Sequence, residues 1–117
     1  MIDDTAIAAL RKRVLLSVQR ALMGEVTPEM RVVEVELSTS RILIRIFTEG
    51  EASEALRADC DAGLATQVVA DFPYPERGDP QVALEFVRCD QPQSIPVRGQ
   101  IIFALAGVTF EPQPGVR

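Results

Sequence analysis

Apolar and polar residues alternate strictly along residues 31–47, RVVEVELSTSRILIRIF. A period of two over β-branched residues is typical of half-buried strands, so this stretch predicts a β-hairpin. With a four-residue loop at 38–41, Val35 faces Ile44 and Glu34 faces Arg45. That register places the apolar residues on one face of the hairpin. It also forms a cross-strand ion pair, which is worth about 0.2–1 kcal/mol. The positions expected in the core are Val33, Val35, Leu37, Ile42, Ile44 and Ile46.

Two other stretches repeat apolar residues at three- and four-residue spacing, which predicts amphipathic helices. The first covers residues 4–23 and ends before Gly24. The second covers residues 54–70, and its apolar stripe recurs every four residues. The stripe of the second helix consists of Leu56, Cys60, Leu64 and Val68.

Asp71 follows the second predicted helix directly. A carboxylate at a helix C-terminus opposes the helix dipole by about 0.3–1 kcal/mol. We therefore expect a compensating partner, such as an arginine of the sheet or of the first helix. The alternative is that Asp71 binds another protein.

Two later stretches predict strands. In the first, residues 81–88, the apolar Val82, Leu84 and Phe86 alternate with Ala83, Glu85 and Val87. Residues 100–106, QIIFALA, form a nearly continuous apolar run. Such a run suits a strand that is buried on both faces or exposed at an interface.

The predicted order is helix, strand, strand, helix, strand, strand. This order favours an α+β fold in which two helices pack on one face of a four-stranded, largely antiparallel sheet. We expect one domain over residues 1–110 and a C-terminal tail over 111–117. The opposite sheet face has no helix left to cover it and is a possible interaction surface. That face carries Glu34, Glu36, Leu43, Arg45 and Phe47.

Composition removes several classes of function. The 117 residues contain no histidine, which excludes the commonest general base and metal ligand. Cys60 and Cys89 are far apart and form no C-x-x-C pair, so we expect reduced core cysteines of a cytoplasmic protein. A net charge of −5 argues against direct nucleic-acid binding. No apolar run reaches membrane-spanning length, so we expect no membrane partner.

No motif for phosphate binding or for a nucleophilic serine occurs. We therefore expect no enzyme, no cofactor and no metal site. A small enzyme that uses paired carboxylates is the least favoured alternative, because such pairs form only in three dimensions.

Two segments together resemble a known group of proteins: LSVQRALMGEVTP at 16–28 and VADFP at 69–73, with a predicted hairpin and the acidic segment GEASEALRADC at 50–60 between them. Over about residues 15–105 the chain resembles small bacterial immunity proteins of toxin–immunity and contact-dependent inhibition systems. The resemblance implies a cytoplasmic, non-catalytic binding protein that occludes a co-encoded toxin, often a nuclease. Toxins that act on nucleic acid tend to be basic, and an acidic inhibitor would complement them.

Acidic residues gather around the second predicted helix, and we take them as the residues that contact the partner. The alternative is a structural module that forms a homodimer through its C-terminal strand, at residues 101–106. The predicted contacts are Glu49, Glu51, Glu54, Asp61 and Asp71.

Overall fold

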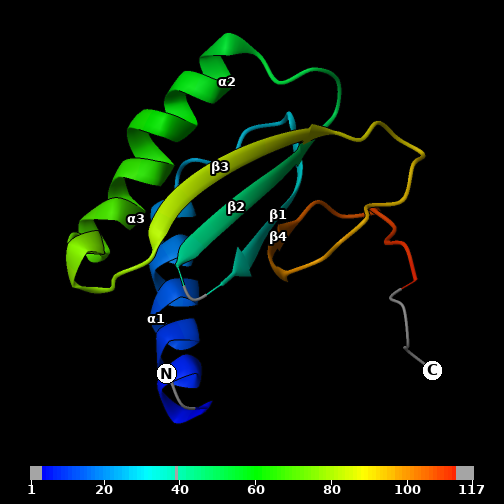
Figure 1. Cartoon of the computed structure of the whole chain (residues 1–117). Helices are drawn as coiled ribbons and strands as arrows, with labels where there is room; N and C mark the ends of the chain where they lie inside the picture. The colour runs from blue at the N-terminus through cyan, green and yellow to red at the C-terminus, as the bar shows by residue number, and fades with distance from the viewer. Residues whose placement is uncertain (1–3, 39, 113–117) are drawn as a thin grey trace.

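The computed structural model describes residues 4–38 and 40–112 (Figure 1). A first helix and a hairpin are followed by a second helical segment, a short 3-10 turn and two further strands. The elements are α1 (Asp4–Leu22), β1 (Met30–Leu37), β2 (Arg41–Thr48), α2 (Glu54–Asp59), η1 (Cys60–Ala65), α3 (Thr66–Asp71), η2 (Pro75–Arg77), β3 (Gln81–Arg88) and β4 (Gln100–Ala104).

The four strands form one sheet in the order β3-β2-β1-β4. β1 pairs antiparallel with β2, and Glu34 lies opposite Arg45 while Val35 lies opposite Ile44. The predicted hairpin and its register are therefore confirmed. The third predicted strand is also confirmed, with β3 spanning the predicted residues.

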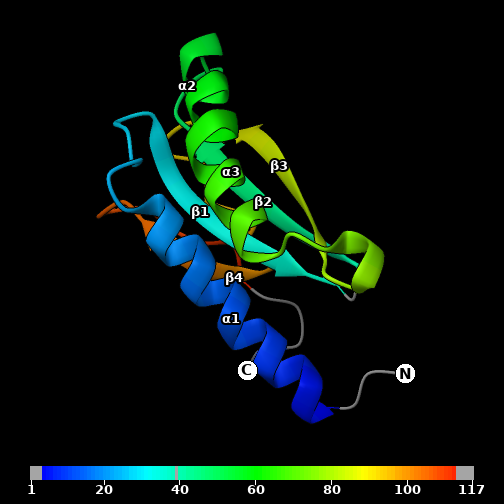
Figure 2. The same cartoon turned by 90° about the vertical axis from the view of Figure 1, so that its left-hand side faces the viewer.

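The predicted α+β class is confirmed, but the sheet is mixed. β1 is antiparallel to both of its neighbours, whereas β2 and β3 run parallel. The reason is the helical segment between β2 and β3, which carries the chain back to the end of the sheet where β2 began. Figure 2 shows this segment and α1 on the same side of the sheet.

The second helix contains a π-helical turn, η1, between α2 and α3. In an α-helix a four-residue spacing overshoots the turn by about 40° per step, so a stripe of such residues would drift around the helix. The i→i+5 bonding of η1 widens the turn and offsets this drift. The Thr66 hydroxyl donates to the Asp61 carbonyl oxygen, five residues earlier, at 3.0 Å. All four stripe residues, Leu56, Cys60, Leu64 and Val68, are buried.

The main core lies between the helices and the predicted apolar face of the hairpin. Five of the six predicted hairpin positions are buried there, and the partly buried Leu37, next to the hairpin loop, packs against them. α1 contributes Val14 and Val18, and β3 adds the partly buried Val82, Leu84 and Phe86.

The helix-free face is not bare. Residues 89–99 fold over its end and bury Val32 and Phe47 in a second apolar cluster with Cys89 and Ile95. As expected, no helix of the described residues covers this face, but part of it is closed all the same. An irregular segment, rather than a helix, closes it.

The last strand is shorter than predicted. β4 ends at Ala104, and Phe110 forms an isolated bridge with Ile95. The Glu111 amide donates to the Ile95 carbonyl oxygen at 3.0 Å. Residues 113–117 of the predicted tail lie outside the described residues, so the domain boundary stays a prediction.

Candidate partner-binding site

The centre of the helix-free face holds a cluster of four charged side chains, which we call the Arg45 cluster. The Arg45 guanidinium contacts Glu34 on β1, Glu36 on β1 at 3.0 Å and Glu85 on β3 at 2.6 Å. Alternation on three adjacent strands brings these residues to one face. Three carboxylates surround a single guanidinium, so the cluster has an excess of negative charge.

Burial within the Arg45 cluster is uneven. The Glu34 side chain is 0% exposed and that of Arg45 10%, whereas those of Glu36 and Glu85 are 45% and 48% exposed. Desolvation lowers the pKa of Arg45, but hydrogen bonds to Glu85, Glu34 and Glu36 outweigh it and raise that pKa above its ordinary value. Arg45 therefore stays charged, and the two half-exposed carboxylates can meet a partner.

Glu34 also ties the loop to the sheet. Its second carboxylate oxygen accepts hydrogen bonds from the amides of Arg98 and Gly99, both at 2.9 Å. Gly99 has no room for a side chain, because a Cβ there would overlap the backbone of Val35. The end of the 89–99 segment is thus fixed by a buried carboxylate and by a close backbone contact.

Arg31 fixes the beginning of the same segment, a role that the sequence did not suggest. It is 2% exposed, and its Nη1 donates to the carbonyl oxygens of Cys89 and of Gln93, the latter at 3.3 Å. Its Nε has no partner within the described part of the chain. No pattern around Arg31 distinguishes it from a solvent-facing arginine at the start of a strand.

Two of the predicted contact residues lie where β2 and β3 end. Glu49 accepts a hydrogen bond from the Gln91 amide at 3.0 Å, and Glu51 lies 3.9 Å from Arg88. Asp90, beside them, bonds Arg88 and accepts from the Gly50 amide at 2.6 Å. The hydrogen bond from Arg88, followed by that from Gly50, lowers the pKa of Asp90.

Glu54 and Asp61 are exposed on the second helix. Between them, the Arg57 guanidinium lies 4.9 Å from the centre of the Phe86 ring on β3. Arg57 therefore marks the side of the helix that faces β3, and residues three or four positions away share that side. Glu54 and Asp61 thus flank β3, as Glu51 does at its end.

Asp71 lies apart from the other four predicted contacts. Its Oδ2 accepts from the Ser17 hydroxyl at 2.7 Å and pairs with Arg20 at 3.2 Å. Both partners are on α1, so the predicted compensation by an arginine of the first helix is confirmed. The carboxylate joins the two helices.

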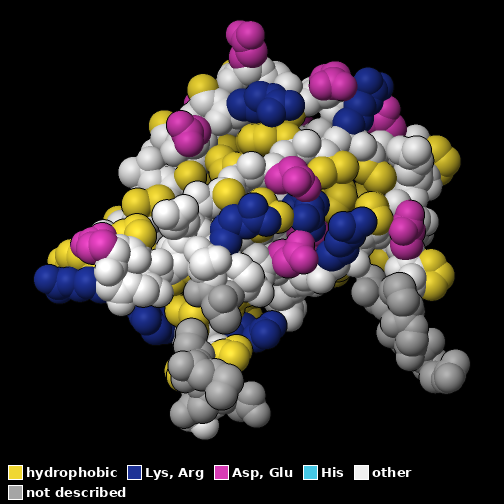
Figure 3. Space-filling model, in the orientation of Figure 1, with side chains coloured by type: hydrophobic (Ala, Val, Ile, Leu, Met, Phe, Trp, Pro, Cys, Tyr) yellow, Lys and Arg dark blue, Asp and Glu magenta, His cyan; other side chains and the backbone are white. Residues whose placement is uncertain are grey.

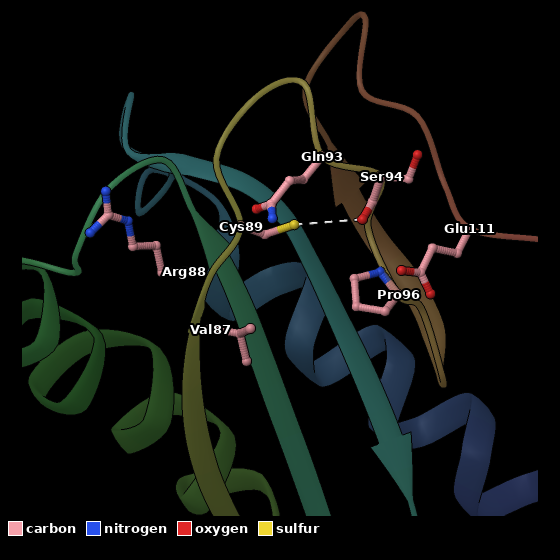
Figure 4. A pocket seen from close by; sticks show the side chains of 7 residues that line it. All are labelled: Val87, Arg88, Cys89, Gln93, Ser94, Pro96 and Glu111. Atoms are coloured by element: carbon pink, nitrogen blue, oxygen red, sulfur yellow. Dashed lines mark hydrogen bonds between the residues drawn. The ribbon is translucent and has the colours of Figure 1, made fainter.

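A hollow of about 320 Å³ lies beside the end of β3 (Figure 4). Cys89 Sγ donates to the Ser94 carbonyl oxygen at 3.6 Å, and Glu111 borders the opposite side. Cys89 borders the hollow, although its side chain is largely buried. The lining residues are Val87, Arg88, Cys89, Gln93, Ser94, Pro96 and Glu111.

Both cysteines are free and buried, as predicted. Burial, followed by the negative charges of Glu25 and Asp59, raises the pKa of Cys60 to about 11. A thiol with such a pKa is a poor nucleophile at neutral pH.

Figure 3 shows acidic and basic side chains mixed over the middle of the face seen in Figure 1, with apolar side chains around them. Within residues 4–38 and 40–112, no group of three or more potential ligands could hold a metal ion. No helix among the described elements is both long and apolar enough to cross a membrane.

The chain matches the MafI2 immunity protein family over residues 11–105 and belongs to that family. The resemblance to immunity proteins seen in the sequence is therefore confirmed. No curated protein matches the chain. An immunity protein acts against a toxin, so membership of the family implies a toxin as protein partner.

Proposed function

We propose that this chain is a non-catalytic inhibitor that binds its co-encoded toxin in the cytoplasm and covers the toxin's active site. Membership of the immunity protein family is the observation that carries the proposal. The helix-free face also suits a protein-binding role, because it presents the half-exposed carboxylates of Glu36 and Glu85. We propose that the toxin domain is basic, and that a nuclease is the class it fits best.

The proposed contact surface is the side of the molecule around β3. Glu49, Glu51 and Glu54 lie near the end of β2 and β3, and Asp61 follows on the helix. Negative charge in this arrangement would steer a basic toxin and speed its association at low salt. Asp71 is already paired with Arg20, so we expect it to contribute least to binding.

The test is the affinity of the purified chain for the toxin domain encoded beside it, measured by calorimetry and by surface kinetics. We expect a sub-micromolar complex whose association rate falls as salt rises. Glu54→Lys with Asp61→Lys should slow association by about tenfold or more.

Asp71→Asn is the matched control, because it removes a carboxylate of the same helical segment that is already paired with α1. It should leave association within about twofold of wild type. A complex whose association rate responds neither to salt nor to the double charge reversal would refute this surface. Absence of any complex would refute the proposed function.

A further inference from the structure

β3 forms one outer edge of the sheet. The Gln81 amide donates to the Ser40 carbonyl oxygen and the Cys89 amide to that of Thr48, both at 2.9 Å. The odd-numbered residues of β3 therefore turn their backbone groups toward β2. Since successive residues of a strand alternate, the even-numbered residues turn theirs toward the open edge. These residues are Val82, Leu84, Phe86 and Arg88.

The backbone groups on this edge have no hydrogen-bond partner within the described part of the chain. β3 pairs with β2 over eight residues without a register shift and contains no proline. Natural proteins commonly protect an outer strand by making it short, bulged or interrupted by proline. β3 has none of these features.

The other outer strand, β4, is protected in this way. It has only five residues, and its register with β1 shifts between Val33 and Glu34. The two edges of one sheet therefore differ, and β3 is the edge that is competent to accept another strand.

Charge beside β3 indicates what kind of strand would fit. Glu85 points to the helix-free face and is half exposed, and Arg45 already shares its charge among three carboxylates. A residue of an added strand that lies directly opposite Glu85 would have its Cβ about 4.5–5.5 Å away. A lysine or arginine there would offset the excess negative charge of the Arg45 cluster.

We propose that an extended, basic segment of the toxin adds to the free edge of β3 as a fifth strand, with a lysine or arginine opposite Glu85. This inference rests on the proposed function and specifies how the partner is held. Backbone hydrogen bonds supply affinity in such strand addition, and alternate side chains supply specificity.

A second copy of this chain fits the edge less well. In a symmetric antiparallel pair of β3 strands, the registers with the greatest overlap place Glu85 opposite its own copy or diagonally beside it. Like charges in these positions are destabilising. A basic strand of another protein meets no such repulsion.

The test is amide hydrogen exchange of the full chain, alone and saturated with the toxin domain encoded beside it. We expect the amides of Val82, Leu84, Phe86 and Arg88 to exchange at least about tenfold more slowly in the complex. The amide of Ala104 should change little, because it turns away from β1 on the opposite edge.

Two proline variants form a matched pair. Val82→Pro removes an outward amide at the start of β3, where proline leaves the bonds to β2 intact. It should weaken toxin binding by about tenfold or more. Ala104→Pro does the same on the edge of β4 and should change the affinity less than about threefold. Glu85→Lys should weaken binding more than Glu85→Gln.

The outcomes separate this inference from the proposed function. A tight complex in which the β3 amides exchange as in the free chain would overturn strand addition and leave the inhibitor role intact. Failure to form a complex would overturn both. Protection of the same amides in the isolated chain, together with a dimer in sedimentation, would assign the edge to a second copy and overturn the proposal.

Discussion

The two faces of the sheet use alternate residues of the same strands, yet they are closed by different means. Ile44 faces the helices within a fully apolar core, and the adjacent Arg45 faces the other way into a cluster of carboxylates. The helical face needs only apolar contacts. The helix-free face combines a small apolar cluster with a buried ion pair whose carboxylate accepts hydrogen bonds from two amides of the 89–99 segment.

This difference shows that a charged residue on an alternating strand is not always solvent-facing. Glu34 is as buried as any residue of the apolar core. A buried carboxylate is tolerated because Arg45 and two amides satisfy it. The carboxylate in turn fixes a segment that no helix supports, so here an ionic interaction organises the chain.

Arg45→Met should have the largest effect on stability. It leaves Glu34 buried without a cation, and removal of one partner from a buried pair typically costs about 3–5 kcal/mol. Glu36→Gln is the control, since its half-exposed carboxylate should contribute only about 0–1 kcal/mol. Urea denaturation of both variants checks the difference. Equal losses would show that the cluster behaves as a surface ion pair.

Ile44→Ala probes the opposite face one residue earlier. Truncation of a fully buried isoleucine should cost about 2–5 kcal/mol, whereas Ile44→Val should cost about 0.5–1.5 kcal/mol. The same denaturation assay applies. If Ile44→Ala costs less than Ile44→Val, the helical face is not the close-packed core described above.

Gly99→Ala tests the close contact that closes the helix-free face. Its Cβ would overlap the Val35 backbone, which cannot rotate away, so we expect a loss of about 1–3 kcal/mol. Gly63→Ala is the contrast, since its nearest neighbour is the flexible end of the Glu25 side chain. Thermal melting should place Gly63→Ala near wild type. A larger loss at Gly63 than at Gly99 would contradict the assignment.

Asp71→Asn should have the smallest effect on stability. The carboxylate pairs with Arg20 at the surface, and exposed pairs contribute about 0–1 kcal/mol. The loss should shrink further at high salt because the charges are screened. Melting temperatures at low and high salt check this. A loss that is large and independent of salt would mean that the bond from Ser17 dominates.

The hairpin could be predicted in detail because two independent constraints selected one register. Apolar alternation and the opposition of Glu34 to Arg45 gave the same pairing. The buried stripe from Leu56 to Val68 could also be predicted from its four-residue spacing. The π-helical turn that accommodates this spacing was not predicted. A compensating partner for Asp71 could also be predicted, because a carboxylate at a helix C-terminus opposes the helix dipole.

Other features depended on contacts that a local pattern does not encode. A helical connection is compatible with either direction of the next strand, so the parallel pairing of β2 and β3 was missed. The 89–99 segment has no periodicity, and only the folded chain shows that Arg31 and Glu34 hold it. The contrast between the edges of β3 and β4 also required the strand order.

The most direct test of the account is a titration of toxin activity with this chain. The toxin partner that the immunity family implies is held well above the dissociation constant of the complex, and the rate at which the toxin acts on its own substrate is measured. An occluding inhibitor predicts a linear fall that reaches zero at one molar equivalent. Complete loss at a small fraction of an equivalent, or undiminished activity at an excess, would contradict inhibition by stoichiometric binding.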